Sequence, residues 1–373
     1  MSIKIDPFQL EVIKNCFDAI ADDMSLTLMR TAHSGIVRDS MDFSTAICDA
    51  KGQTLAQGVT TPMHLGSFYD AMQHLMHRYE GDIHPGDCFI GNDPYAADGQ
   101  HLPDIYIVEP IFHEGAIIAW TTTLAHHADV GGIVPGSNAL GASEIYQEGL
   151  RLPFLKLFER GEMNAALWEV IGLNVRVPEM VHGDLRAQMA ASRAGRRSFA
   201  DLVERFGVTE VLAAAEALHD YAERLGRAEI RDLPNGTYHF TDHMDGLGEH
   251  PEPIVIKVAL TIHDESISVD FDGSSPQVEG GVNTPLPCLQ PAPVPTVDGD
   301  LGDWSAVRPT IWLVSEKTRA ELRALWTDEG LYFALAVRTL SVTPGVAGQF
   351  WEADSAEIFL DPDSSGGAAF DGD

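Results

Sequence analysis

Five side chains that can bind a metal ion lie within about thirty residues of the chain, in the segments GQHLPDIYIVEP (99–110) and LAHHADVGG (124–132). Imidazole nitrogens and carboxylate oxygens are common protein ligands of Mn²⁺, Fe²⁺ and Zn²⁺. The five residues are His101, Asp104, His126, His127 and Asp129. A metal site would require the fold to bring several of them to one point.

The chain between these residues has the pattern of a β-hairpin. Two apolar runs, 104–113 and 116–124, lie on either side of Glu114-Gly115, as expected of two strands joined by a tight turn. A turn centred there pairs residues whose numbers sum to about 229. Asp104 is then expected opposite Ala125, one step from the first histidine of the pair.

Such pairing would let a carboxylate and an imidazole share one cation, because opposed residues on antiparallel strands have Cβ atoms roughly 5 Å apart. His101 precedes Asp104 by three residues and would close the third side. We therefore predict that His101, Asp104 and His126 bind a divalent transition metal (Mn²⁺, Fe²⁺ or Zn²⁺) with positions left open for water or substrate. The spacing also fits polar residues at a strand end, since a chain with 15 histidines places some near one another.

Four further residues are candidates with weaker signals. His127 and Asp129 could orient the ligands, because a ligating imidazole usually donates its other N–H group to a carboxylate or carbonyl. Asn92 and Asp93, in the segment GNDPY, could direct polar groups at a substrate. The same two residue types are also typical of an ordinary turn.

Other catalytic chemistries find little support. The sequence has no GxxxxGK[ST] phosphate-binding loop, so we expect ATP to bind elsewhere. Cys48 and Cys88 lie inside apolar runs, where a buried, inert thiol is more common than a nucleophile. The GSS segment at 273–275 lacks the G-x-S-x-G pattern of a nucleophile elbow.

Composition narrows the partners and the compartment. The formal charge of -32 is spread along the chain, with 14 acidic against 5 basic residues from 288 to 373 alone. Nucleic acid and anionic membranes are therefore not expected as partners. The four cysteines are far apart and no apolar run is long enough to span a bilayer, so we expect a cytoplasmic protein without an export signal.

The N-terminal region mixes helices and strands. Asp6-Pro7 is a typical helix start, and apolar residues every four positions predict a helix from 7 to about 32. Its predicted buried stripe is Phe8, Val12, Cys16, Ile20, Met24 and Leu28. The segment DFSTAICDAKGQTLAQG predicts a strand, a Lys51-Gly52 turn and a return strand, and GDCFIGNDP predicts a short strand that ends in a loop.

The later part of the chain changes character twice. Residues 162 to 230 have helical periodicity, and alternation then predicts strands at 237–242, 253–263 and 266–272. The proline-rich stretch 287–295 is typical of a stiff linker. We therefore predict a domain over 1–286 and a second, all-β domain over 296–373.

Several segments resemble the hydantoinase B/oxoprolinase family, which includes the B subunit of N-methylhydantoinase and the α subunit of acetone carboxylase. They are DPFQLEVIKN, SGIVRDSMDFSTAICDAKGQTLAQG, HLGS, GDCFIGNDPYAADGQHLPDI, LAHHADVGG and GGVNTP. The resemblance implies a metal at His101, Asp104 and His126, and a hydantoinase A-like partner subunit that binds ATP. It covers only the first half of the family's usual length, so we expect a truncated family domain.

The C-terminal segments VDGDLGDWS, ALWTDEGLYFALAV and WEADSAEIFLDPD resemble the family 9 carbohydrate-binding modules, which are β-sandwiches. In that family two tryptophans enclose a sugar, and Trp351 occupies the position of one of them. The resemblance implies carbohydrate as a possible ligand, although a core position also fits this tryptophan. Here too only part of the module is expected.

We therefore expect an α+β fold, with a mixed enzyme-like domain that contains a helical segment, followed by a partial sandwich-like β domain. The expected function is the metal-containing subunit of an ATP-dependent enzyme that hydrolyses a cyclic amide, such as a hydantoin or 5-oxoproline, or carboxylates a ketone. One alternative is a non-catalytic carbohydrate-binding protein on a degenerate scaffold. The other is an inactive truncated fusion.

Overall fold

The computed structural model describes residues 5–60, 64–137, 139–248 and 251–285, together with the backbone of three strands between 311 and 339. The chain divides into two compact units, Met1–Thr296 and Val297–Asp373. Trp351 and Cys288 lie outside the described residues.

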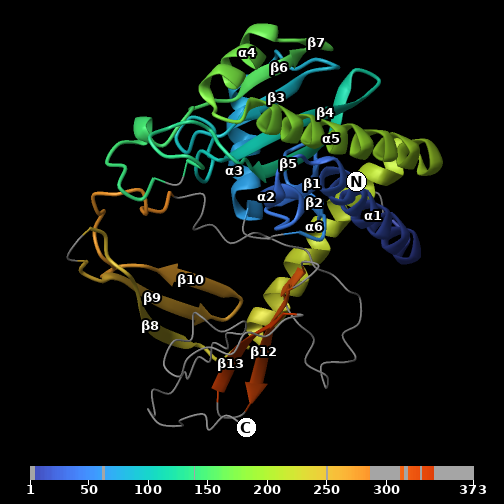
Figure 1. The fold of residues 1–373 in the computed structure, drawn as a ribbon. Helices are drawn as coiled ribbons and strands as arrows, with labels where there is room; N and C mark the ends of the chain where they lie inside the picture. The colour runs from blue at the N-terminus through green and yellow to red at the C-terminus, as the bar shows by residue number, and fades with distance from the viewer. Residues whose placement is uncertain are drawn as a thin grey trace. The chain divides into compact units, whose positions relative to one another are not determined.

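The first unit is built on a seven-stranded antiparallel sheet with the order β2-β1-β5-β4-β3-β6-β7 (Figure 1). The strand and return strand predicted around Lys51-Gly52 are confirmed as the first two strands. The strands are β1 Phe43–Asp49, β2 Thr54–Gln57, β3 Cys88–Gly91, β4 Asp104–His113, β5 Ala116–His126, β6 Leu155–Glu159 and β7 Glu162–Met163.

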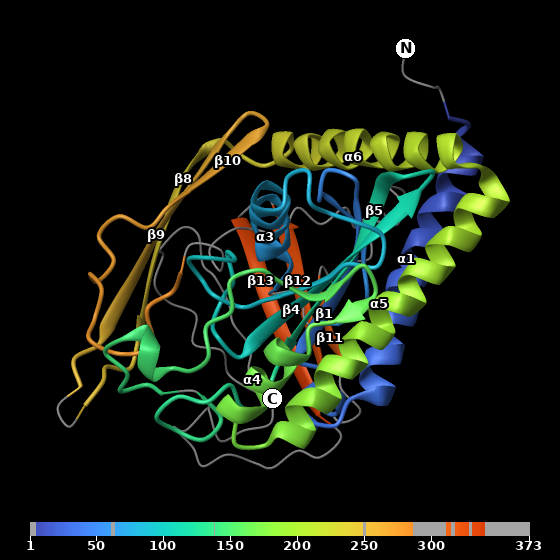
Figure 2. The same ribbon diagram turned by 90° about the horizontal axis from the view of Figure 1, so that it is seen from above.

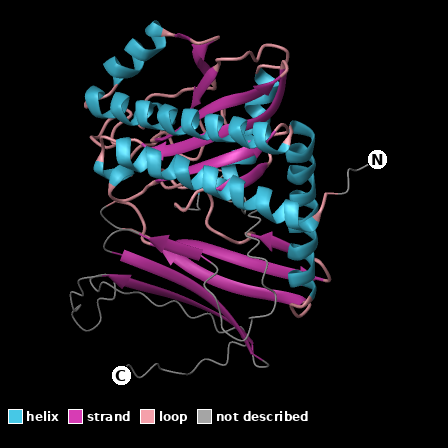
Figure 3. Ribbon diagram, turned by 90° about the vertical axis from the view of Figure 1, so that its right-hand side faces the viewer, coloured by secondary structure: helices cyan, strands magenta, loops and turns pink. Residues whose placement is uncertain are grey.

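Helices cover both faces of this sheet. Figure 2 shows α3 on one side of β4 and β5, with α1 and α5 on the other, and Figure 3 shows the long helices lying across the strands. The helical stretch predicted from 162 to 230 is confirmed as α4, α5 and α6, whereas α3 was not predicted. The helices are α1 Pro7–Thr31, α2 Gly35–Arg38, α3 Leu65–Arg78, α4 Ala165–Asn174, α5 Pro178–Phe206 and α6 Val208–Arg231, with a short 3-10 turn at Ile145–Gln147.

The alternation of side chains along β4 assigns its residues to these two layers. Tyr106 and Val108 belong to the core cluster that contains Phe68 and Met72 of α3. Ile105 and Ile107 belong to the cluster that contains α5. Even-numbered residues of β4 therefore face α3, and odd-numbered ones face α5.

Helix α1 begins as predicted, with the Asp6 carboxylate accepting a hydrogen bond from the Gln9 N–H at 3.1 Å. The predicted buried stripe is correct only at its C-terminal end, where Ile20, Met24 and Leu28 are buried. Phe8 is 79% exposed, and the buried residues nearer the start of the helix are Ile13 and Phe17. The reason is that a helix has 3.6 residues per turn, so a row of residues spaced by four winds away from the core.

The predicted hairpin is present as β4 and β5, with one irregularity near its turn. Phe112 pairs with Ile117, as a two-residue turn requires, but the next pair is Ile111 with Ala119. Ile118 is therefore an extra residue on β5, a β-bulge.

This bulge shifts the register of every pair between it and the far end of the hairpin. Asp104 lies opposite His126, not opposite Ala125 as predicted. The prediction was wrong by one residue because it assumed uninterrupted pairing from the turn. The shift places the carboxylate and the imidazole in the same pair.

A smaller sheet ends the described part of the first unit. Its strands, in the order β10-β9-β8, confirm the three that were predicted in this region. They are β8 Gly236–Met244, β9 Ile254–His263 and β10 Ser266–Asp270. Helix α6 extends from the helical layer to this sheet (Figures 1 and 2).

The second unit contains a three-stranded antiparallel sheet in its described part. The strands follow one another in the order β11-β12-β13, which agrees with the all-β pattern predicted for this region. They are β11 Ile311–Val314, β12 Thr318–Thr327 and β13 Gly330–Thr339. Among the described helices of the whole chain, none is both long and apolar enough to cross a membrane.

Candidate metal centre

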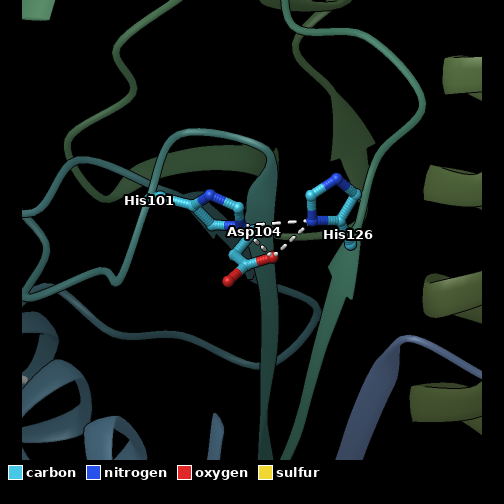
Figure 4. A group of neighbouring side chains, drawn as sticks. All are labelled: His101, Asp104 and His126. Carbon is cyan, nitrogen blue, oxygen red and sulfur yellow. Dashed lines mark hydrogen bonds and ion pairs between the residues drawn. The ribbon is translucent and has the colours of Figure 1, made fainter. Parts of the chain in front are cut away.

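His101, Asp104 and His126 converge at one end of the β4–β5 hairpin (Figure 4). Oδ1 of Asp104 lies 3.0 Å from Nε2 of His101 and 3.3 Å from Nδ1 of His126. The two ring nitrogens are 3.1 Å apart. All three donor atoms lie within 4.8 Å of one another, and no other group of this kind occurs among the described residues.

The local fold explains why these three side chains meet. Asp104 is the first residue of β4 and His126 the last of β5, and the two are directly paired. A turn precedes β4, in which the Asp104 N–H donates to the His101 carbonyl at 3.0 Å. This turn brings His101 back over the end of the hairpin. The carboxylate belongs to an even position of β4, so the site lies on the side of the sheet that α3 covers.

The geometry fits a single small cation. Ligand atoms at about 2.0–2.2 Å from a metal ion are about 3.0–3.5 Å from their neighbours in tetrahedral or octahedral coordination. The three distances given above fall in this range. Moreover, Oδ1 of Asp104 is buried, and the two ring nitrogens that lie close to it are the other two donor atoms of the group. Burying an ionised carboxylate is costly unless it is paired, and a cation bound among the three donor atoms would add such a pairing.

The electrostatics favour an ionised carboxylate at the centre. Burial alone would raise the pKa of Asp104, but the neighbouring imidazoles of His101, His126 and His64 outweigh burial and hold it well below its usual range. Burial likewise acts to lower the pKa of His101, but the Asp104 carboxylate dominates and raises it. Asp104 therefore carries a negative charge near neutral pH, as a metal ligand must.

Two residues that the sequence analysis did not single out complete the surroundings. Nε2 of His64 lies 3.8 Å from Oδ2 of Asp104 and 3.5 Å from Oδ1 of Asp42. Its other nitrogen is 3.0 Å from the Ser44 hydroxyl. His64 is buried at the start of α3, and burial is the main cause that lowers its pKa. A neutral His64 can donate one N–H to either carboxylate without adding charge.

Asp42 lies on the opposite side of His126 from β4. The His126 N–H donates to the Asp42 carbonyl at 3.0 Å, and Oδ2 of Asp42 is 3.8 Å from Nδ1 of the imidazole. The Asp42 side chain is 35% exposed, and that of His101 is 42% exposed. These two residues mark the side of the centre that solvent or a substrate can reach.

His127 does not point at the three converging side chains. It follows the last residue of β5, and its Nε2 donates to Oε1 of Gln188 in α5 at 2.9 Å, on the other side of the sheet. Burial is the main cause that lowers its pKa. His127 therefore joins the strand end to α5.

The Asp129 carboxylate binds Arg176 and not the residues of the centre. Its carboxylate accepts hydrogen bonds from the Arg176 backbone N–H at 2.6 Å and from the guanidinium at 2.8 Å. The same guanidinium donates to the carbonyls of Gly131, Gly132 and Val134. Asp129 thus anchors the loop after β5 and contacts no imidazole of the centre among the described hydrogen bonds.

Asn92 and Asp93 act as loop anchors. The Asn92 amide donates to the carbonyls of Leu102 and Leu150 and accepts from the Leu152 N–H. Both oxygens of the Asp93 carboxylate are engaged, one by two backbone N–H groups of its own turn and the other by the Arg151 guanidinium. These bonds support the turn interpretation of the pair, because both side chains are buried and hold the chain that leads to His101.

The cysteines show no sign of nucleophilic activation. Cys48 and Cys88 are buried in β1 and β3. Burial raises the pKa of the Cys48 thiol to about 12, and it raises that of Cys88 well above the usual value. Thiolates at these positions are not accessible near neutral pH, as the sequence analysis predicted.

Comparison with known proteins agrees with the architecture. Residues 6–295 match the Hydantoinase B/oxoprolinase family, and residues 304–373 match the family described as Carbohydrate family 9 binding domain-like. The chain is 33% identical over 280 residues to caprolactamase subunit beta of Pseudomonas jessenii, covering 75% of this chain. It is 30% identical over 295 residues to 5-oxoprolinase of Dictyostelium discoideum, covering 76% of this chain.

Solved structures give the same picture. The crystal structure of ATP-dependent caprolactamase from Pseudomonas jessenii superposes with a TM-score of 0.72 at 32% identity, covering 77% of this chain and 49% of that one. A nucleotide-free acetone carboxylase shares the fold, with a TM-score of 0.65 at 23% identity over 72% of this chain and 38% of that one.

The matches cover most of this chain but only part of each relative. The chain spans 48% of the length of caprolactamase subunit beta and 23% of the length of the 5-oxoprolinase. The family match nevertheless includes the whole of the large sheet and the centre at the end of its hairpin. The chain belongs to the hydantoinase B/oxoprolinase family.

Proposed function

We propose that His101, Asp104 and His126 bind one divalent transition metal, Mn²⁺, Fe²⁺ or Zn²⁺, and that the chain acts as the metal-containing subunit of an ATP-dependent enzyme. The enzyme hydrolyses a cyclic amide, such as a hydantoin, 5-oxoproline or a lactam, or carboxylates a ketone. The observation that carries this proposal is the convergence of three donor atoms within 4.8 Å around a buried carboxylate oxygen.

The metal would supply Lewis acidity to a substrate oxygen or to a water molecule. His101 and Asp104 would fix its position, His126 would complete the set, and His64 would orient the Asp104 carboxylate by donating to Oδ2. Asp42 lies on the accessible side of the centre, where its carboxylate could accept a proton from a group bound beside His126. A binding step at this side would exclude water from the partly exposed His101.

ATP would be used by a hydantoinase A-like partner subunit. This chain has no phosphate-binding loop pattern in its sequence, and the name caprolactamase subunit beta implies a second subunit in that relative. We propose that the partner activates the substrate with ATP and that the activated substrate reaches the centre described above. The spacing of the cysteines supports a cytoplasmic location for such an enzyme.

Metal analysis tests the first part of the proposal. Protein purified without chelators should contain close to one equivalent of Mn, Fe or Zn, and His101→Ala, Asp104→Ala and His126→Ala should each lose it. His113→Ala provides a matched control, because His113 lies at the other end of the same hairpin. Absence of bound metal after reconstitution with all three ions would contradict the proposal.

Turnover tests the second part. The chain should be co-expressed with a hydantoinase A-like subunit and assayed for ATP consumption with hydantoin, 5-oxoproline, caprolactam and acetone. ATP-dependent conversion of one of them, lost in Asp104→Ala, is the expected result. Metal binding without any turnover would favour an inactive truncated form that keeps its ligands.

A second candidate function rests on the match of residues 304–373 to a carbohydrate-binding family. We propose that this part of the chain binds a sugar by stacking against Trp351. Titration with oligosaccharides should quench tryptophan fluorescence, and Trp351→Ala should abolish the change. Unchanged fluorescence across a panel of xylan-, cellulose- and mannan-derived sugars would exclude this function.

A further inference from the structure

The small sheet β8–β10 is amphipathic. Paired residues on antiparallel strands share a face, and the register pairs Phe240 with Val258, Met244 with Ile254, and Leu260 with Val269. One face of the sheet is therefore almost entirely apolar. We call it the apolar sheet face.

The opposite face is polar. The register pairs Thr241 with Lys257 and Ser268 with Thr261. Strands that alternate in this way indicate that one face packs against another layer while the other meets solvent. The polar face thus has the composition expected of a solvent-exposed face, and the apolar sheet face does not.

The apolar sheet face has no adequate cover in the part of the chain that the structure describes. Phe240 is 50% exposed, Val269 48%, and Met244 and Ile267 42% each. Only Ile262, in the middle strand, is fully buried. Three-stranded sheets normally depend on packing of their apolar face for stability, and a contiguous apolar patch of this kind marks an interaction surface.

The comparisons supply a candidate for the layer that covers this face. The sheet is the last described element within the family match, which ends at residue 295. The chain accounts for 49% of the caprolactamase chain to which it is similar. About half of a hydantoinase B-type polypeptide therefore has no counterpart here, and the uncovered face lies where the family-like part of this chain ends.

We propose that the apolar sheet face is the docking surface for the unmatched half of a hydantoinase B-type polypeptide. The occupant presents an apolar layer to Phe240, Val258 and Val269. Asp242 lies on the same face, because it pairs with Ile256. The occupant therefore carries one hydrogen-bond donor for the Asp242 carboxylate and no other charged group at this surface. The inference depends on family membership and on the sheet, and not on whether the centre binds metal.

Co-expression tests the proposal with the full chain. The 373-residue chain should be co-expressed with a tagged polypeptide comprising the half of Pseudomonas jessenii caprolactamase subunit beta that this chain does not match, and in parallel with the corresponding half of the Dictyostelium discoideum 5-oxoprolinase family domain. We expect a one-to-one complex with at least one of them. Phe240→Glu combined with Val269→Lys should weaken it at least about tenfold, as charges in the centre of an interface do.

Matched controls lie on the other face of the same strands. Thr241→Glu combined with Ser268→Lys introduces the same charges on β8 and β10 and should leave binding within about twofold of the wild type. Circular dichroism and thermal unfolding show whether each double variant is folded. A variant that fails to fold is replaced by Val269→Ser alone, for which a smaller loss of binding is expected.

Hydrogen exchange on the chain alone supplies the second measurement. Amides of β8 and β10 should exchange faster than those of β4 and β5, and become protected on complex formation. Three outcomes would overturn the proposal: no complex with either half, a dimer of this chain that the charged variants on the apolar sheet face disrupt, or protection of β8 and β10 by residues 297–373 in the monomer.

Discussion

Asp104 presents its two oxygens to different partners. Oδ1 faces His101 and His126, and Oδ2 faces His64. A buried carboxylate held in this way has a fixed orientation, so the donor atoms of the proposed metal site are preorganised. The accessible groups, Asp42 and His101, lie to one side and leave the carboxylate itself shielded from water.

His64 should tune metal affinity without being a ligand. We predict that His64→Gln lowers the affinity about 10–100-fold, as loss of a group that orients a ligand usually does, while the stoichiometry at saturating metal stays unchanged. Competition with a fluorescent chelator measures the affinity, with His113→Gln as the control. Complete loss of the metal in His64→Gln would instead make His64 a ligand.

Asp129 should matter for stability and for its dependence on pH. Burial acts to raise its pKa, but the Arg176 N–H groups and charge prevail and lower it from the ordinary 3.8. A depressed pKa means that the folded state gains stability from this carboxylate above about pH 4 and loses it as the pH falls through the folded-state pKa.

We therefore predict that Asp129→Asn lowers the free energy of unfolding by about 1–3 kcal/mol at pH 7, the usual effect of removing a charged hydrogen-bond partner. The difference from the wild type should shrink as the pH falls below about 4. Urea unfolding at pH 7, 5 and 3 measures both effects. A difference that is constant across this range would show that the charge of Asp129 contributes nothing.

At the scale of secondary-structure elements, α1, α5 and β5 approach one another closely at Gly195. A Cβ built there would lie 2.4 Å from Sδ of Met24 and 3.1 Å from the Thr121 methyl group. Gly226, in α6, has no neighbour within 4 Å of such a Cβ. The two helical glycines can therefore be compared directly: close packing requires a glycine at position 195, whereas position 226 has room for a side chain.

We predict opposite signs for the two alanine substitutions. Gly195→Ala should destabilise the protein by about 1–3 kcal/mol through overpacking. Gly226→Ala should stabilise it by about 0.5–1 kcal/mol, because alanine is a better helix former. Thermal and urea unfolding of both variants check this, and equal effects would mean that Met24 moves aside at no cost.

The sequence predicted those parts of the fold that are encoded locally. The hairpin and the approach of His101, Asp104 and His126 to one another could be predicted because one turn and two apolar runs fix their approximate pairing. The bulge at Ile118 could not, since Ile117 and Ile118 are equally suited to a regular strand. The bulge shifts the strand register by one residue, and this shift decides which residue lies opposite Asp104.

His64 and Asp42 were missed for a different reason. Asp42 reaches the centre because β1 pairs with β5, placing Phe43 opposite Ala125, and His64 does so because α3 packs on that face of the sheet. Neither the order of strands in a sheet nor the side taken by a helix can be read from local periodicity. Asp129, Asn92 and Asp93 look like site residues in the sequence for the converse reason, since loop anchors and ligands use the same polar side chains.

On the scale of the whole molecule, charge is the dominant collective property. A formal net charge of -32 places many carboxylates within reach of one another, and self-repulsion of this kind disfavours the compact state. Repulsion between surface charges is screened by salt. The uncovered apolar face and the excess negative charge therefore act in opposite directions on association.

We predict that raising the ionic strength from about 0.01 M to about 0.15 M, which shortens the Debye length from about 30 Å to about 8 Å, raises the melting temperature. The same change should increase self-association through apolar surface. Differential scanning calorimetry and analytical ultracentrifugation measure the two effects. A melting temperature that falls with salt would mean that specific ion pairs outweigh the net repulsion.

The β4–β5 hairpin has a consequence for the timing of assembly. Its three converging side chains lie within one short, contiguous piece of backbone, and isolated hairpins close in about 1–10 μs. The nascent chain can therefore form this part of the centre soon after His126 leaves the ribosome. An ion captured at that moment would be in place before the helices that follow are synthesised, and it would act as a folding nucleus as well as a cofactor.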